Sequence, residues 1–196
     1  MKERLPLATI HSAVLEFMRG RHDAAVFGAQ AVNAYVQQPR MTQDVDILST
    51  CAEQLVNELQ RELSERFRIA VRIRKVAKGT GYRLYEVRKP SDRHLVDVRG
   101  IDKLPACERV AQILVPVPAE LICQKLLSMV SRPNSPKGMT DTADLQRLLL
   151  AFPDLKTAAG EVSDGFRARR VNQATFDAWH TLVDQEIVPE EDDMGS

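Results

Sequence analysis

The chain has 196 residues, and its 27 lysines and arginines balance its 27 aspartates and glutamates, so no overall basic field indicates a nucleic-acid partner. A chain of this length buries about 70% of its unfolded surface and folds without disulfides or a structural metal. Its three cysteines have no Cys-x-x-Cys spacing, which favours reduced thiols and a cytoplasmic location. No apolar run approaches the roughly 20 residues that cross a bilayer, and a signal-peptide pattern is absent, so we expect no membrane partner.

The chain opens with a β-α-β pattern behind one helix. Apolar residues recur at helical spacing over residues 7–18, which predicts an amphipathic helix. A short apolar strand at 24–27 and a helix at 29–36 follow, and Pro39 ends that helix. A second strand is predicted at 42–48.

Asp44 and Asp46 are separated by one residue in the predicted strand 42–48. Side chains alternate along a strand, so both carboxylates point to one face while Val45 and Ile47 point into the core. Like charges held this close repel one another unless a cation or a shared proton compensates. A cation site is therefore one explanation, and an ordinary exposed face of an edge strand is the other.

Gly28 and Ala29 lie between the first strand and the helix that follows it. The backbone amides of such a strand-to-helix turn are able to face a phosphate group. Both residues are therefore candidate phosphate-binding positions.

After a predicted helix at 51–66, residues 68–75 and 82–88 change to period two and predict a β-hairpin. Basic side chains line this hairpin. A solvated strand face explains them, and the alternative is a track for the phosphates of RNA or of a nucleotide tail. The basic residues are Arg68, Arg72, Arg74, Lys75, Lys78, Arg83 and Arg88.

A third carboxylate, Asp97, lies in a predicted apolar strand at 94–100. It points opposite Val96 and Val98, which belong to the core face of that strand. We expect His94, at the start of the strand, to be a surface histidine and not a ligand.

Pro118 begins a helix in which Lys125 shares one side with Leu121, Leu126 and Met129. A lysine among apolar neighbours has two explanations. Either its stem lies along them and the ammonium reaches solvent, or the ammonium binds a nucleotide phosphate.

The segment 132–138 has the composition of a loop, and we expect the next helix to begin at Thr140 or Asp141. Asp141 is then either an ordinary N-cap or a functional carboxylate beside the apolar stripe. Pro153 interrupts the helical run, and residues 154–186 predict one or two further amphipathic helices.

The apolar strand, the glycine turn and an Arg-x-Thr-x-Asp-x-Asp run resemble the nucleotidyltransferase superfamily, and within it the AbiEii/AbiGii-toxin-like branch. The resemblance implies an α+β fold: a nucleotidyltransferase-like mixed β-sheet flanked by helices, with a C-terminal helical extension. We expect a nucleotidyltransferase-like core at 1–116, a helical region packed on it at 117–188, and an acidic tail at 189–196. The residues that carry the resemblance are Gly28, Ala29, Arg40, Thr42, Asp44 and Asp46.

The resemblance implies a magnesium-dependent enzyme that moves a nucleoside monophosphate from an NTP to a tRNA, protein or small-molecule acceptor. Asp44, Asp46 and Asp97 would be its catalytic residues and would hold two magnesium ions. The branch also implies the toxin of a toxin–antitoxin or phage-defence system, with an antitoxin as partner. The nucleotide-binding residues that the resemblance implies are Gly28, Ala29, Arg40, Thr42, Lys125 and Asp141.

Two positions depart from the pattern of this branch. Ala29 stands where many members have serine or glycine, and Thr140 stands where a lysine is common. A second hypothesis is therefore a catalytically inactive binding or regulatory protein on the same scaffold. A third is an enzyme on this scaffold that modifies a small molecule.

Overall fold

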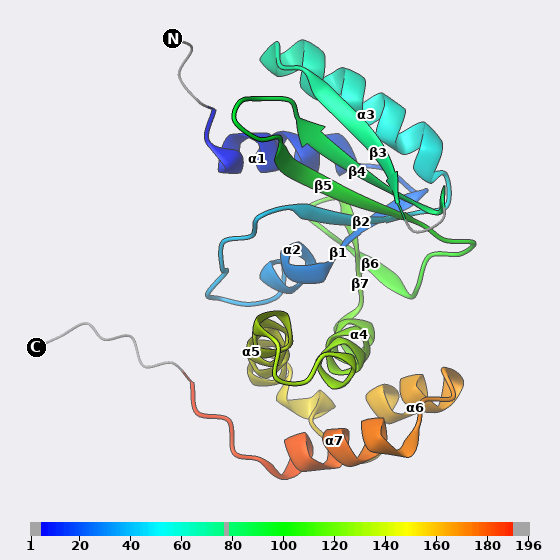
Figure 1. Cartoon of the computed structure of the whole chain (residues 1–196). Helices are drawn as coiled ribbons and strands as arrows, with labels where there is room; N and C mark the ends of the chain where they lie inside the picture. The colour runs from blue at the N-terminus through cyan, green and yellow to red at the C-terminus, as the bar shows by residue number, and fades with distance from the viewer. Residues whose placement is uncertain (1–4, 77–78, 190–196) are drawn as a thin grey trace, which may run out of the picture. The chain divides into compact units, whose positions relative to one another are not determined.

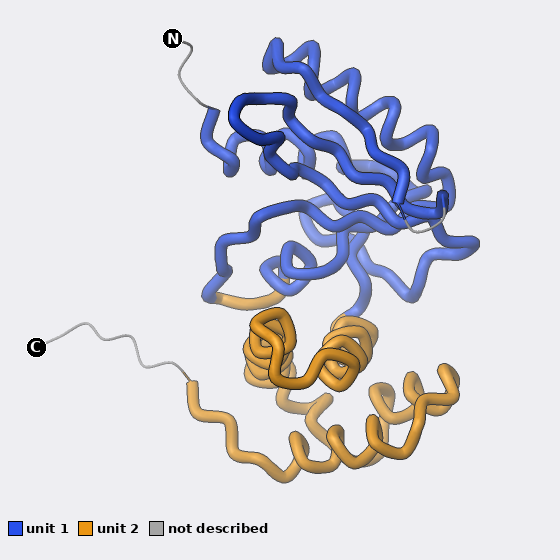
Figure 2. Tube along the Cα trace, in the orientation of Figure 1, with its two compact units in different colours: residues 1–34, 38–117 blue, residues 35–37, 118–196 orange. Residues whose placement is uncertain are grey.

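The structure, a computed structural model, describes residues 5–76 and 79–189. The chain divides into two compact units, which Figure 2 colours separately. Unit 1 comprises residues 1–34 and 38–117, and unit 2 comprises residues 35–37 and 118–196. Lys78 and most of the predicted acidic tail lie outside the described residues. Within the described ranges, no helix combines the length and the apolar character that crossing a membrane requires.

Unit 1 is built on a five-stranded mixed sheet with the order β1-β2-β5-β4-β3 (Figure 1). The pair β2 and β5 is parallel, and the other three pairs are antiparallel. This mixed sheet confirms the α+β class predicted from the sequence. The strands are β1 (Ala24–Phe27), β2 (Val45–Ser49), β3 (Val71–Val76), β4 (Gly81–Glu86) and β5 (Arg93–Gly100).

Two helices, α1 (Leu7–Met18) and α3 (Ala52–Phe67), contact each other and pack on the sheet. Leu55, Leu59 and Leu63 recur every fourth residue of α3 and are fully buried. The apolar residues of the covered sheet face form rows across the strands, because directly paired residues share a face. One row is Ile73, Leu84, Val96 and Val45; the other is Tyr82, Val98, Ile47 and Val26, and the exposed Lys75 pairs with Tyr82 at its outer end.

The helix α2 (Gly28–Asn33) is shorter than the predicted helix at 29–36. The side chain of Asn33 bonds to both backbone groups of Arg40, accepting from its N–H at 3.0 Å and donating to its carbonyl at 2.8 Å. These two bonds fasten the loop before β2 to the end of α2. The chain therefore enters β2 from a fixed position.

A second, two-stranded sheet joins β6 (Cys107–Val110) to β7 (Ile113–Pro116), and no sequence pattern predicts it. Its turn residues Ala111 and Gln112 have φ values of 47° and 68°. A two-residue hairpin turn with positive φ at both positions is of type I′, and such turns usually carry Asn-Gly or Asp-Gly. Because Ala-Gln carries no such signal, the hairpin was not recognisable from its turn.

Unit 2 is helical. Its long helices α4 (Pro118–Ser131) and α5 (Pro136–Ala151) contact each other, and α4 also contacts α6 (Glu161–Ala168) and α7 (Gln173–Asp184). The short 3-10 turn η2 begins at Pro153, where an interruption was predicted. The core of the unit is formed by Leu121, Ile122, Leu126, Leu145, Leu148, Phe166 and Trp179.

The start predicted for α5, at Thr140 or Asp141, is wrong by about one turn. Ser135 is the N-cap, its hydroxyl accepts a hydrogen bond from the Gly138 N–H at 3.0 Å, and Pro136 is the first helical residue. Proline is compatible with that position because its missing N–H would have no helical partner there. Asp141 therefore lies inside the helix and is not its N-cap.

Candidate active site

Two of the three predicted acidic residues are direct neighbours across strands. Asp46 on β2 and Asp97 on β5 are paired in register. Val45 and Ile47, on either side of Asp46, are fully buried, so the alternation of the strand turns Asp46 to the opposite face. The parallel pair therefore presents two carboxylates on the sheet face that α1 and α3 do not cover.

Asp44 lies just before β2, outside the strand in which it was predicted. Its Oδ2 is 3.2 Å from His94 Nδ1, and His94 Nε2 is 3.5 Å from Asp97 Oδ1. The ligand atoms of these three residues all lie within 4.8 Å of one another. His94 is thus the centre of the cluster and is half-buried between Asp44 and Asp97, so the prediction of a surface histidine is wrong, whereas the prediction that it is not a ligand stays a prediction.

A β-bulge explains why His94 was missed. On β5, Val96 pairs with Leu84 and His94 pairs with Tyr85, so Leu95 is an extra residue without a partner on β4. Strict alternation would turn His94 to the sheet face away from Asp97. The extra residue returns His94 to the face that carries Asp97, which no pattern of period two indicates.

Two cations neutralise the carboxylates of this cluster. The carboxylate of Asp44, and then that of Asp97, raise the pKa of His94 to about 10, against the lowering effect of burial. Arg83 Nε donates a hydrogen bond to Asp97 Oδ1 at 2.8 Å. Burial raises the pKa of Asp97, but His94 and Arg83 outweigh it, so that pKa lies below its usual value. The two carboxylates therefore favour the protonated form of the imidazole.

Gly28 brings the strand-to-helix turn directly against Asp46. Its φ is +65°, in the left-handed region that favours glycine. A Cβ atom at this position would lie 3.0 Å from Asp46 Cγ and closer still to Oδ2. Only glycine combines this positive φ with so close a contact, so the turn packs directly on Asp46. Ala29 follows Gly28 in α2.

The loop residues Arg40 and Thr42 are both tied to α2. Thr42 Oγ1 accepts a hydrogen bond from Gln30 Nε2 at 2.8 Å, and the backbone of Arg40 is held by Asn33. The Arg40 guanidinium donates to the Met41 carbonyl at 3.3 Å. The hydroxyl of Thr42 therefore braces the loop that leads to Asp44.

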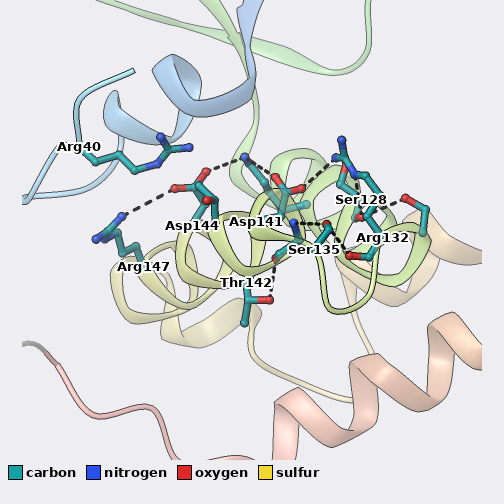
Figure 3. Close-up of polar contacts among 12 residues, drawn as sticks. Arg40, Ser128, Arg132, Ser135, Asp141, Thr142, Asp144 and Arg147 are labelled. Atoms are coloured by element: carbon teal, nitrogen blue, oxygen red, sulfur yellow. Dashed lines mark hydrogen bonds and ion pairs between the residues drawn. The ribbon is translucent and has the colours of Figure 1, made fainter. Parts of the chain in front are cut away.

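Lys125 and Asp141 belong to unit 2 and bond to each other there. Lys125 Nζ donates to Asp141 Oδ1 at 3.0 Å and to Asp144 Oδ2 at 2.6 Å. Arg132 Nη2 donates to the other oxygen of Asp141 at 2.9 Å, and Arg147 lies 3.8 Å from Asp144 (Figure 3). Lys125 is 93% buried, so its ammonium does not extend to solvent. The nucleotide-binding role that the resemblance implies for Lys125 and Asp141 stays a prediction.

The carboxylates of unit 1 fit a divalent cation. Asp44 and Asp97 converge on one point, Asp46 is the register neighbour of Asp97, and carboxylate oxygens suit magnesium. In the structure, the protonated form of His94 supplies the positive charge between the carboxylates of Asp44 and Asp97. A protonated imidazole does not coordinate metal, so an ion that used His94 would release its proton.

The architecture of the chain is that of the nucleotidyltransferase-like folds. Solved structures establish this likeness, whereas no protein-family model and no curated protein matches the sequence. At identities of 10–14% the likeness is one of fold alone.

Three solved structures illustrate the likeness. The Megavirus polyadenylate synthase aligns with a TM-score of 0.60 and 12% identity over 75% of this chain, which spans 32% of that protein. A putative nucleotidyltransferase from Helicobacter pylori aligns with a TM-score of 0.56 and 10% identity, over 90% of this chain and 91% of the other. The antibiotic-resistance factor ANT(2'')-Ia aligns with a TM-score of 0.51 and 14% identity, over 89% of this chain and 95% of the other.

Proposed function

We propose that this protein transfers a nucleoside monophosphate from an NTP to an acceptor hydroxyl, with a divalent cation held by Asp44, Asp46 and Asp97. The observation that carries the proposal is the in-register pair of Asp46 and Asp97, with Gly28 packed against Asp46. Its occurrence on a nucleotidyltransferase-like fold supports this chemistry over other uses of paired carboxylates.

In this reaction the acceptor hydroxyl gives up its proton, which a carboxylate of the site such as Asp97 would accept. Its oxygen attacks the α-phosphorus of the NTP, the bond to the oxygen that bridges the α- and β-phosphates breaks, and pyrophosphate leaves. The bound cation would neutralise charge on the phosphates. Asp46 and Asp97 would hold that cation from adjacent strands, and Gly28 permits the close approach of the turn. Asp97 would complete the ligand set, and its ionised carboxylate is also the candidate acceptor for the proton of the attacking hydroxyl.

The test is transfer of label from an α-labelled NTP in the presence of Mg²⁺, with bulk tRNA, protein and small hydroxyl compounds as separate acceptors. Asp46→Asn removes one carboxylate and should lower transfer by more than about 100-fold, since even the partners of metal ligands cost 10–100-fold when removed. The melting temperature should change by less than about 4 °C. Asp102→Asn, an exposed aspartate of the same unit, is the matched control and should transfer normally.

One observation favours a second candidate, a nucleotide-binding protein without turnover. His94 and Arg83 already compensate Asp44 and Asp97, so the cluster is electrostatically satisfied by the chain itself. Nucleotide binding without label transfer to any acceptor would favour this candidate and contradict the first. The toxin role is tested separately, by whether growth arrest on expression disappears with Asp46→Asn.

A further inference from the structure

The sheet face that bears Asp97 also carries basic and aromatic side chains in two cross-strand rows. Directly paired residues of adjacent strands share a face, so the strand register defines these rows. In one row Arg74 pairs with Arg83, and Arg83 pairs with Asp97. In the other row Arg72 pairs with Tyr85, which pairs with His94. We call Arg72, Arg74, Arg83 and Tyr85 the arginine rows.

The arginine rows lead from the sheet edge to the candidate site. β3 is the edge strand, β4 and β5 follow, and β2 with Asp46 is next. At about 4.8 Å between strands, the distance from Arg74 to Asp46 is about 14 Å. A polymer lying along the rows would therefore place an end at the carboxylates while earlier units contact the arginines.

The rows carry three arginines against the two carboxylates that pair with them, Asp92 and Asp97, so a positive charge remains. The side chains of Arg72, Arg74 and Arg83 are 50%, 51% and 46% exposed. A single oxygen of Asp92 receives Arg72 Nη1 at 3.0 Å and Arg74 Nη2 at 3.1 Å, so two cations share one carboxylate. A planar guanidinium suits phosphate because it donates hydrogen bonds in a fixed fork.

An aromatic surface lies between the arginines and the site. The guanidinium carbon of Arg74 is 4.7 Å from the centroid of the Tyr85 ring. The Tyr85 and His94 rings have centroids 5.0 Å apart and an interplanar angle of 33°. Aromatic rings beside cations bind single-stranded nucleic acids by stacking with bases while the cations contact phosphates.

We propose that the arginine rows bind a single-stranded nucleic acid whose terminal hydroxyl is the acceptor. This inference rests on the proposed function, to which it adds the class of acceptor. The combination of guanidinium forks with an aromatic platform fits alternating phosphates and bases. An acidic peptide would engage the cations, but it would have no planar group to stack on the edge of the Tyr85 and His94 rings that their contacts with each other and with Arg74 leave uncovered.

The test measures binding of fluorescently labelled single-stranded RNA and DNA by anisotropy, in EDTA and without NTP. Arg72→Gln/Arg74→Gln should weaken binding by at least about tenfold. It should also reduce the slope of log K against log salt by about 1.4, since each phosphate contact to a single strand contributes about 0.7. Comparing the RNA and DNA arms shows which sugar the surface accepts.

The matched control is Arg66→Gln/Lys75→Gln, which also removes two cations from unit 1. Lys75 is on the same strand as Arg72 and Arg74, but its Nζ pairs with Glu53 of α3 at 3.1 Å, on the covered face. Arg66 pairs with Glu16 at 2.7 Å. This control should bind nucleic acid as the unchanged protein does, and circular dichroism should show all variants folded.

Equal loss of binding in the two double variants would overturn the inference, because net charge alone would then explain it. Polyglutamate competing as well as RNA would overturn it too, in favour of an acidic protein partner. Nucleic-acid binding through the arginine rows without nucleotidyl transfer would contradict the proposed function and the acceptor role of the terminal hydroxyl, and would leave only the binding surface. Transfer to a small molecule, unaffected by Arg72→Gln/Arg74→Gln, would contradict only this inference.

Discussion

At the scale of single residues, Gly28 shows how one missing Cβ positions a carboxylate. We predict that Gly28→Ala destabilises the protein by about 2–3 kcal/mol, through left-handed strain and displacement of Asp46. Gly20→Ala is the control, since Gly20 has φ +74° and no atom within 4 Å of an added Cβ. Gly20→Ala should lower the unfolding free energy only by the cost of the left-handed backbone, about 1 kcal/mol. Urea unfolding measures both, and equal losses would contradict the contact with Asp46.

Cys123 is predicted to be chemically inert in the folded state. Burial raises the pKa of its thiol to about 11, above the ordinary value of 9.0. The pKa of this thiol is higher in the folded protein than in the unfolded chain. Its contribution to the unfolding free energy is therefore fully present below about pH 9 and is lost as the pH rises to about 11. In a Cys51→Ser/Cys107→Ser variant, iodoacetamide at pH 8 should modify Cys123 only after denaturation. Rapid labelling of the native variant would show that the thiol is accessible.

At the scale of elements, α4 and α5 are joined by buried charge. Lys125→Met leaves Asp141 and Asp144 without their shared ammonium, and we predict a loss of about 3 kcal/mol in unfolding free energy. Arg132 and Arg147 remain near these carboxylates, which keeps the loss at the low end for a broken buried pair. Thermal or urea unfolding measures the change.

Two further variants separate this explanation from a general effect of removing a lysine. Lys137→Met changes an exposed lysine of the same helix pair and should alter stability by less than about 0.5 kcal/mol. Lys125→Met/Asp144→Asn should be more stable than Lys125→Met alone, because the uncompensated charge of Asp144 is removed. Additive losses in the double variant would contradict a charge-based coupling.

Elements with strong periodicity were predictable, and elements defined by special backbone geometry were not. The spacing of Leu55, Leu59 and Leu63 predicted α3 within one residue at each end. The β6–β7 hairpin was missed because Ala111 and Gln112 adopt positive φ without a glycine or asparagine. Lys75 was assigned to the basic face, but it lies in a row with Tyr82 on the covered face.

At the scale of the whole molecule, the balance of 27 basic and 27 acidic residues concealed a local separation of charge. The sequence located Asp46, Asp97 and Gly28, because alternation and turn chemistry are local properties. It did not locate His94 in the cluster, since that depends on a bulge formed only when β5 meets β4. It also did not indicate that Lys125 is enclosed by two aspartates, because the partners come from another helix.

The position of β3 at the border of the sheet has a consequence for solubility. A border strand offers unpaired amide and carbonyl groups to any other extended chain, and charged side chains are a common protection against such association. Arg72 and Arg74 stand on this strand, half exposed. We therefore expect the guanidinium groups that we assign to a polymeric ligand also to disfavour strand-to-strand addition of further copies of this protein. Selection for either property would then preserve the other.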